Sequence, residues 1–153
     1  MSPILLFILF AVLEGSLLVF TMGAFRYAAS QGAIQVAELG NATDADTQAV
    51  QVIRSAPGVT GLATVTEVDI YHLNPQSNGT FTVDGSEYNK YNLDGSTISV
   101  TWPPSVRNVR TGFTDYFGVS IRYKYQWKSG RLLGSTPLQL TQTIYARLEP
   151  ESY

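Results

Sequence analysis

A single carboxylate interrupts an apolar stretch near the start of the chain. Glu14 is the only charged residue in residues 3–25. At about 1.5 Å per residue, this stretch would form a helix roughly 35 Å long, slightly more than the roughly 30 Å of hydrocarbon in a membrane. A charged side chain at the bilayer centre costs about 2.5–3.5 kcal/mol on insertion scales, so a simple anchor would be better served by leucine. Glu14 is therefore predicted to have a function beyond anchoring.

Side chains suited to catalysis are sparse. His72 is the only histidine, and Asp69 is the acidic residue nearest to it in sequence. No serine lies in a Gly-x-Ser-x-Gly element, and no glycine-rich phosphate loop occurs. The absence of cysteine excludes disulfides, thiolate metal sites and cysteine nucleophiles. The chain is predicted not to be an enzyme, with His72 as a structural or surface residue.

Oxygen-bearing side chains are concentrated in one segment that follows the first expected strands. They are Asp84, Glu87, Asn89, Asn92 and Asp94. Carboxylate and amide oxygens are typical calcium ligands, but their spacing does not match the EF-hand loop. Short polar side chains beside glycine are also typical of turns. We therefore expect turn residues here and no cofactor, with a calcium site as the alternative.

Most of the basic residues lie in one stretch that is also rich in aromatic residues. The basic ones are Arg107, Arg110, Arg122, Lys124, Lys128 and Arg131. Such a mixture could bind single-stranded nucleic acid or sugar. Residues 119–128 alternate, however, between apolar and polar side chains, which places the aromatic and cationic groups on opposite faces of a strand. A solvated strand face is favoured, and no nucleic-acid partner is expected.

Two Asn-x-Ser/Thr sequons begin at Asn41 and Asn78, both in expected loops. In an exported chain, either asparagine could carry an N-linked glycan. These residues are therefore candidate modification sites.

Length and charge limit the architecture. The 153 residues suffice for one modest domain besides a membrane helix. The formal net charge of −2 and the pI near 5.3 give no strong attraction to nucleic acid or to anionic lipid. No Lys or Arg precedes the apolar stretch, which disfavours a conventional signal peptide. Earlier removal of a basic leader would explain this feature.

Small residues continue the helical pattern beyond the apolar stretch. They recur at every fourth position in two series: Ala24, Ala28 and Gly32, and Ala29, Ala33 and Ala37. This spacing places each series on one helix face, where small side chains let another helix approach closely. Alanine is also simply a good helix former. Helix packing is the favoured interpretation.

The remaining pattern predicts an α+β fold. A long N-terminal helix, residues 1–39, ends at Gly40 and is followed by a linker, residues 40–60, with a short helix or strand at 47–54. Residues 61–153 are expected to form a small antiparallel β domain. Its candidate strands cover residues 62–72, 79–83, 97–102, 119–128 and 138–148. The last two are expected to pair across a hairpin connection at residues 129–131.

Several N-terminal features occur together at a characteristic spacing. Pro3 precedes Glu14 by eleven positions, and an Ala-Ala-x-x-Gly-Ala element follows at residues 28–33. With the Arg-Leu-Glu-Pro of residues 147–150, they resemble the TadE-like family, pilin-like proteins of tight-adherence type IV pilus systems. The resemblance covers about a quarter of the chain. The family also carries a Glu close to its leader cleavage point, whereas position 5 here is leucine, so Glu14 matches the family's second, deeper Glu.

The resemblance implies a pilin-like lollipop that polymerises through its N-terminal helix. It also implies that a prepilin peptidase processes the chain and that the chain resides in the cytoplasmic membrane before assembly. Pilus assembly machinery would then export it into an extracellular adhesive filament. In a bundle of identical helices Glu14 needs a partner, because a buried unpaired carboxylate opposes assembly. We expect that partner to be the Met1 amine of a neighbouring subunit, or a helix hydroxyl such as Ser16 or Thr21. The alternatives are a minor pilin and a single-pass anchored binding domain that does not polymerise.

Overall fold

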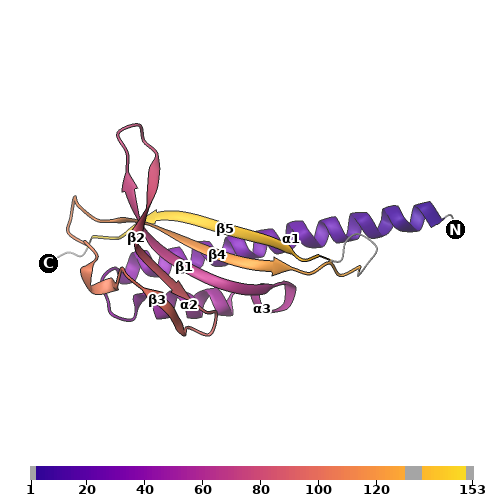
Figure 1. Cartoon of the computed structure of the whole chain (residues 1–153), viewed down its shortest axis with the longest axis horizontal. Coiled ribbons are helices and arrows are strands. Elements are labelled where there is room, and N and C mark those ends of the chain that lie inside the picture. The colour runs from indigo at the N-terminus through magenta and orange to yellow at the C-terminus, as the bar shows by residue number, and fades with distance from the viewer. Residues whose placement is uncertain (1–2, 130–135, 151–153) are drawn as a thin grey trace.

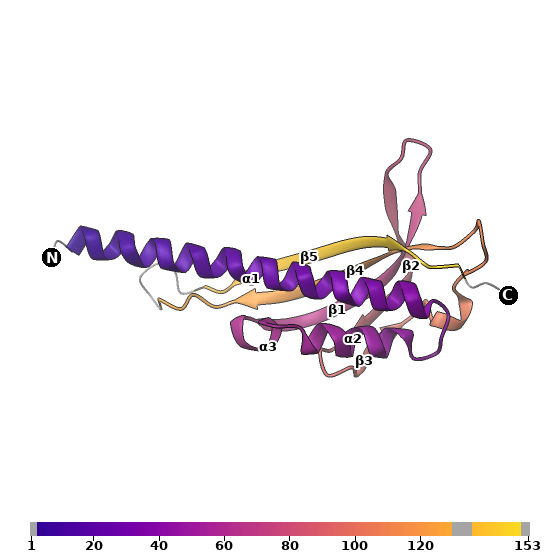
Figure 2. The same ribbon diagram turned by 180° about the vertical axis from the view of Figure 1, so that it is seen from behind.

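One helix dominates the molecule. The computed structural model describes residues 3–129 and 136–150, and α1 (Pro3–Leu39) is continuous over its whole length. It ends at Gly40, whose φ of 53° lies in the left-handed region that closes many helices. Figure 1 and Figure 2 show α1 lying along one face of a sheet and projecting beyond it at the N-terminal end. The predicted long helix and its stop at Gly40 are confirmed.

The sheet is antiparallel and five-stranded. Its strands are β1 (Thr64–Pro75), β2 (Phe81–Tyr91), β3 (Thr97–Val100), β4 (Tyr116–Tyr125) and β5 (Leu138–Arg147), in the order β3-β2-β1-β4-β5. The long pairing of β4 with β5, from Tyr116 opposite Arg147 to Tyr125 opposite Leu138, confirms the expected hairpin partners. Most of the expected connection at residues 129–131 lies outside the described residues. The α+β lollipop is therefore the observed fold.

The linker forms helices rather than an open loop. Helix α2 (Ala45–Ser55) packs beside α1 on the same face of the sheet, and the short α3 (Val59–Leu62) leads into β1 (Figure 2). A single turn of 3-10 helix, η1 (Pro104–Val106), lies between β3 and β4. The segment left open as helix or strand, residues 47–54, is thus helical, since Ala49, Val50 and Ile53 form one buried face.

Strand β2 is longer than the sequence predicts. The prediction ended a short strand at residue 83, but pairing with β1 continues to Tyr91. The turn interpretation of the oxygen-rich segment is wrong for Asp84, Glu87 and Asn89, which all lie in β2. Strand propensity is weak there. Pairing with β1 overrides it at Asn89, whereas Asp84 and Glu87 lie between the paired residues Val83 and Tyr88.

The core fills the space between the two helices and the sheet. Phe25 of α1 stacks on Tyr123 of β4, with ring centroids 3.8 Å apart and planes inclined by 9°. Val36 and Ile53 complete the helical side, and all four side chains are buried. At roughly 25 cal/mol per Å² of apolar area removed from water, this contact holds the second half of α1 on the sheet.

The first part of α1 has no such cover. Large apolar side chains from Ile4, which is 71% exposed, to Leu13, which is 52% exposed, point into open space around the helix. The helix is long and apolar enough to cross a membrane, with a mean hydropathy of 2.5 over its most apolar window. Only 11% of that window is buried within the molecule. The molecule therefore consists of a packed domain and a bare apolar stem.

Candidate functional site

Glu14 lies where the bare stem meets the domain. Its side chain is only 3% exposed and accepts three hydrogen bonds from the end of β4 and the segment that follows. The Tyr125 hydroxyl donates to Oε1 at 2.7 Å, and the backbone N–H groups of Lys128 and Ser129 donate at 2.8 Å and 2.7 Å. We call this arrangement the Glu14 clasp.

The alternation of β4 aims Tyr125 at α1. Tyr123 and Tyr125 both point to the helix side of the sheet, as the two-residue period predicts. Trp127 then packs edge-on against the Tyr125 ring, with centroids 5.7 Å apart. Burial, together with the neighbouring Glu14 carboxylate, raises the pKa of the Tyr125 hydroxyl to about 12, so this group is a hydrogen-bond donor at all ordinary pH values.

The clasp limits how much of α1 a bilayer could hold in this conformation. Within the described part of the chain, residues 3–13 are exposed except for the half-buried Ala11, and they extend about 16 Å along the helix axis. A hydrocarbon layer is roughly 30 Å thick. Inserting all of residues 3–25 would carry the backbone of Lys128 and Ser129 into hydrocarbon, where polar groups are costly. A full span therefore requires the Glu14 clasp to open.

The helix hydroxyls expected to pair with Glu14 are occupied elsewhere within the chain. Ser16 donates to the carbonyl of Val12 at 2.8 Å, and Thr21 donates to that of Leu17 at 2.7 Å. Met1 lies outside the described residues. Within one chain the Glu14 carboxylate is held by Tyr125 and two backbone groups, which the sequence analysis did not identify. Pairing with a neighbouring subunit stays a prediction.

The small residues of α1 face the chain's own domain. Ala28, Ala29, Gly32, Ala33 and Ala37 are all buried. A Cβ built on Gly32 would lie 2.6 Å from Cδ1 of Ile53, so α2 approaches α1 closely there. Ala24 is half-buried, and a Cβ built on Gly58 would lie 3.1 Å from its methyl group. The close helix approach predicted for this spacing occurs inside the subunit.

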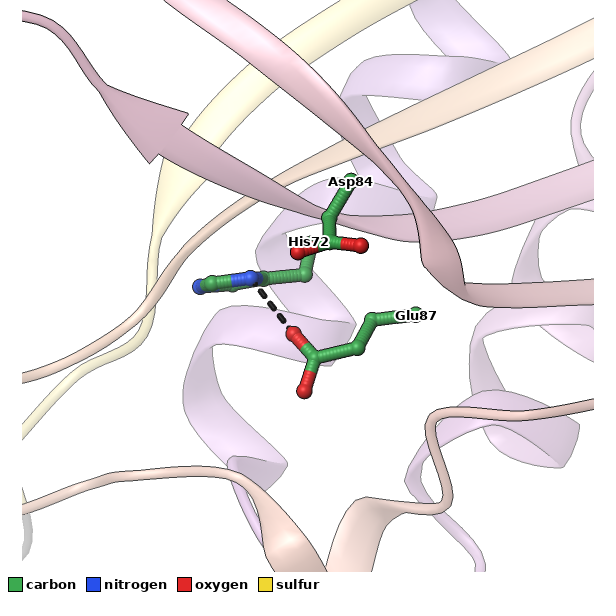
Figure 3. Close-up of side chains that lie close together, drawn as sticks. All are labelled: His72, Asp84 and Glu87. Carbon is green, nitrogen blue, oxygen red and sulfur yellow. Dashed lines mark ion pairs between the residues drawn. The ribbon is translucent and has the colours of Figure 1, made fainter.

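A second cluster forms around His72, where β1 and β2 lose register. Tyr71 pairs with Tyr88 and Leu73 with Val83, so the single residue His72 lies opposite four residues of β2, 84–87. We call these four residues the β2 insertion. Beyond it, the ends of β1 and β2 form a hairpin that stands out from the sheet (Figure 1). Asp84 and Glu87, at the two ends of the insertion, lie close to the imidazole (Figure 3).

Both nitrogens of His72 face carboxylates. Nδ1 lies 2.6 Å from Oε2 of Glu87, and Nε2 lies 3.8 Å from Oδ1 of Asp115. Asp69, the acid nearest in sequence, points to the opposite face of the sheet and contacts Tyr88 and Arg122 instead. His72 is thus half-buried with three acidic neighbours, and its predicted role as a structural or surface residue stays a prediction.

The oxygen-rich segment divides between several environments. Asn89 is buried on the helix side and bonds to Asp46 and to the carbonyl of Trp102. Asn92 and Asp94 form the β2–β3 turn with Ser96, as the turn interpretation predicts for these two. Because the five side chains point in different directions, they do not surround one point as a calcium site would require.

The basic stretch divides in the same way. Arg107 is fully buried at its side chain and pairs with Asp46 at 2.6 Å, with its guanidinium 4.4 Å from the Trp102 ring centroid. Arg122 and Lys124 lie on the exposed face, opposite the buried Tyr123. Arg131 lies outside the described residues. The separation of cations from aromatics along β4, predicted from alternation, is confirmed.

The exposed face of the sheet carries a polar groove of about 550 Å³. At its edge Asp69 is completely buried beneath Arg122 and Tyr88, which contact its Oδ2 at 3.0 Å and 2.9 Å. Burial, reinforced by a hydrogen bond with Glu67, raises the pKa of the Asp69 carboxyl to about 6, although Tyr88 and Arg122 oppose this shift.

The two sequons occupy different positions. Asn41 follows α1 directly and is half-buried. Asn78 lies exposed at the tip of the protruding hairpin, where its Oδ1 accepts hydrogen bonds from the Thr80 backbone and hydroxyl at 3.0 Å and 2.7 Å. Asn78 is therefore the more accessible candidate for a glycan.

Comparison with known proteins adds no relative. No family model matches the chain, and neither curated proteins nor solved structures gave a match.

Proposed function

We propose that this chain is a pilin-like structural subunit of an extracellular filament of the type IV or tight-adherence kind. The observation that carries the proposal is the division of α1 into a bare apolar stem and a half that packs on an antiparallel sheet. The fold supplies one part for a hydrophobic core and another part for a polar coat, as a helical polymer requires.

The stem must be covered in any aqueous setting. Its exposed side chains include Ile4, Leu5, Phe7, Ile8 and Leu9, each half or more exposed. A contiguous apolar surface of this size marks a membrane or protein interaction site in a soluble domain. Lipid would cover it before assembly, and the stems of neighbouring subunits would cover it in the filament.

The TadE-like resemblance agrees with this arrangement. Its matching residues, Pro3, Glu14 and the small residues 28–33, follow α1 from the tip of the stem to the packed half. From the resemblance the proposal includes a precursor in the cytoplasmic membrane, with a prepilin peptidase and the pilus assembly machinery as partners. It also includes adhesion as the role of the fibre.

Isolated surface appendages test the proposal. Filaments sheared from cells would be examined by electron microscopy and immunogold labelling, and by mass spectrometry for peptides of residues 136–150. We expect labelling along the shaft and the chain as a main component. Labelling only at one end would indicate a minor pilin. Recovery of the chain solely in membranes would overturn the proposal in favour of an anchored binding domain.

A matched pair of variants connects this test to the stem. Leu9→Glu places a charge on the exposed apolar stem, whereas Thr60→Glu changes an exposed residue of α3. Loss of filaments with Leu9→Glu and retention with Thr60→Glu is expected. Equal filament yields from both variants would contradict a stem-built core.

A further inference from the structure

The β2 insertion brings the only histidine of the chain together with two carboxylates. One ligand atom from each of His72, Asp84 and Glu87 lies within 4.8 Å of the other two (Figure 3). All three side chains are partly buried. The cluster lies on the domain, away from the stem, and the proposed filament function does not use it.

The local backbone is built to make this cluster. A regular antiparallel pair would place Asp84 and Glu87, three residues apart, on opposite faces of β2. The insertion of residues 84–87 opposite His72 instead lets both converge on one imidazole. Irregularities of this kind commonly occur beside functional sites, where they redirect a side chain.

Hydrogen bonds hold Asp84 in position. Its Oδ1 accepts from the Ser86 backbone N–H at 2.9 Å and from the Ser86 hydroxyl at 2.6 Å. Its Oδ2 accepts from the Asn74 side chain at 3.0 Å. These bonds fix the direction of the Asp84 carboxylate beside His72. A ligating carboxylate is typically oriented by such outer contacts.

The two nitrogens of the imidazole both face acidic groups. Nδ1 is buried and has no hydrogen-bond partner of acceptable geometry, although Glu87 lies beside it. Nε2 faces the Asp115 carboxylate, which itself accepts a hydrogen bond from the Asn108 backbone at 2.8 Å. Metal-binding histidines usually donate a hydrogen bond from their second nitrogen to a carboxylate, a carbonyl or water. Asp115 lies on that side of the ring, although 3.8 Å is longer than a hydrogen bond.

We propose that His72, Asp84 and Glu87 bind a divalent transition-metal ion of the zinc class. His72 supplies Nδ1, each carboxylate supplies one oxygen, and solvent completes the coordination. One nitrogen and two oxygens suit zinc, whereas calcium takes six to eight oxygen ligands. The ion would tie the protruding hairpin to the body of the sheet.

Binding an ion requires the three ligand atoms, which lie within 4.8 Å of one another, to adopt the spacing of a metal site. Bonds of about 2.0–2.2 Å in a tetrahedral site hold ligand atoms roughly 3.4 Å apart. Nδ1 of His72 and Oε2 of Glu87 must separate from 2.6 Å toward that value. The Glu87 side chain is 39% exposed and free to rotate outward, while Asp84 stays fixed by Ser86 and Asn74.

The competing explanation is a protonated His72 between Glu87 and Asp115. It needs no metal, because an imidazolium with a carboxylate at each nitrogen is a balanced arrangement. The two explanations differ in one measurable respect. In the metal site Nδ1 is bonded to the ion, whereas in the ion pair Nδ1 carries a proton.

Titration of the full-length chain with Zn²⁺ tests the proposal. The protein in detergent micelles would be titrated by calorimetry, with Ca²⁺ as a separate arm. We expect one equivalent of Zn²⁺ per chain and no Ca²⁺ binding. Asp84→Asn should weaken Zn²⁺ binding about 10- to 100-fold. Asp94→Asn is the matched control, because Asp94 forms the same turn with Ser96 but has no histidine beside it.

A second measurement remains informative if the Asp84 variant folds poorly. In ¹⁵N spectra of the wild-type chain, Zn²⁺ is expected to shift the Nδ1 resonance of His72 to that of a metal-bound nitrogen. Equal Zn²⁺ affinity of Asp84→Asn and Asp94→Asn would overturn the proposal. A protonated Nδ1 that Zn²⁺ leaves unchanged would do the same, in favour of the ion pair.

Discussion

The Glu14 carboxylate and the Tyr125 hydroxyl, 111 residues apart in sequence, are joined by a 2.7 Å hydrogen bond that fixes the end of β4 to the stem. Glu14→Leu removes this acceptor and leaves three donors without a partner. Each buried donor left unsatisfied costs about 1–3 kcal/mol, so local opening of the segment after β4 is expected. Amide hydrogen exchange at Lys128 and Ser129 should accelerate about 10- to 100-fold.

Two variants control this experiment. Glu14→Gln keeps one side-chain oxygen and should give an intermediate exchange rate, since an amide nitrogen cannot accept from Ser129. Glu38→Leu makes the Leu substitution at an exposed position of the same helix and should leave both amides unchanged. If Glu14→Leu preserved the protection of Lys128 and Ser129, the clasp would not be what orders this segment.

The approach of α1 to α2 predicts opposite effects for two glycines of one helix. A Cβ at position 32 would lie 2.6 Å from the buried Ile53, whereas one at position 23 would contact nothing within 4 Å. Gly32→Ala should lower the free energy of unfolding by about 1–3 kcal/mol through overpacking. Gly23→Ala should raise it by about 0.5–1 kcal/mol through helix propensity. Urea unfolding monitored by tryptophan fluorescence measures both, and a stabilising Gly32→Ala would contradict the close packing.

Breaking the buried ion pair between Arg107 and Asp46 is expected to destabilise the folded chain strongly. Asp46 also accepts hydrogen bonds of 2.8 Å from Asn89 and Tyr91, so the carboxylate joins α2 to β2 and to the segment after η1. Arg107→Met leaves a buried charge without its partner and should cost about 3–5 kcal/mol. Arg110→Met, at an exposed position, should cost no more than about 0.5 kcal/mol.

A double substitution separates charge from packing at this site. If the loss comes from the unpaired charge, Asp46→Asn should recover part of the stability lost in Arg107→Met. If the stability losses of the two single substitutions simply added in the double variant, the Arg107 side chain would instead act through its packing against Trp102.

Periodicity predicts the parts of the fold that have a strong pattern. The continuous apolar stretch, the small residues at every fourth position and Gly40 define α1, and strict alternation identifies the buried face of β4 at Tyr123 and Tyr125. Ser120 departs from that pattern: it is buried because its hydroxyl pairs with those of Tyr71 and Thr143 across three strands. Such a contact depends on register and is not visible in a single strand.

The sites were less predictable than the elements that carry them. Glu14 stands out in the sequence as a charge among apolar residues, but two of its three partners are backbone groups, which have no sequence signature. The cluster at His72 depends on an insertion in β2 that only strand pairing reveals. Neighbours in sequence were misleading there, since Asp69 points to the opposite face and Asp115 comes from a distant loop.

The raised pKa of the Asp69 carboxyl should give the folding stability an unusual pH dependence. Its pKa is raised from 3.8 to about 6, chiefly by burial, so the folded state favours the neutral form. Its contribution to stability is therefore fully present below pH 3.8 and is lost as the pH rises through about 6. Asp69→Asn removes the titration but keeps a similar shape. The free energy of unfolding of the wild type, minus that of Asp69→Asn, should fall between pH 4 and 7, roughly the interval set by these two values.

Asp94 provides a control of opposite sign. Hydrogen bonds from the Ser96 side chain and backbone lower the pKa of the Asp94 carboxyl, so its contribution is present above its ordinary pKa and is lost as the pH falls. The difference between the wild type and Asp94→Asn should therefore rise with pH. The groups that face Asp69 are Glu67 of the same strand, Tyr88 of β2 and Arg122 of β4, and all three are retained in both variants. A wild-type minus Asp69→Asn difference that rose with pH would show that attraction to Arg122, rather than burial, controls the ionisation of Asp69.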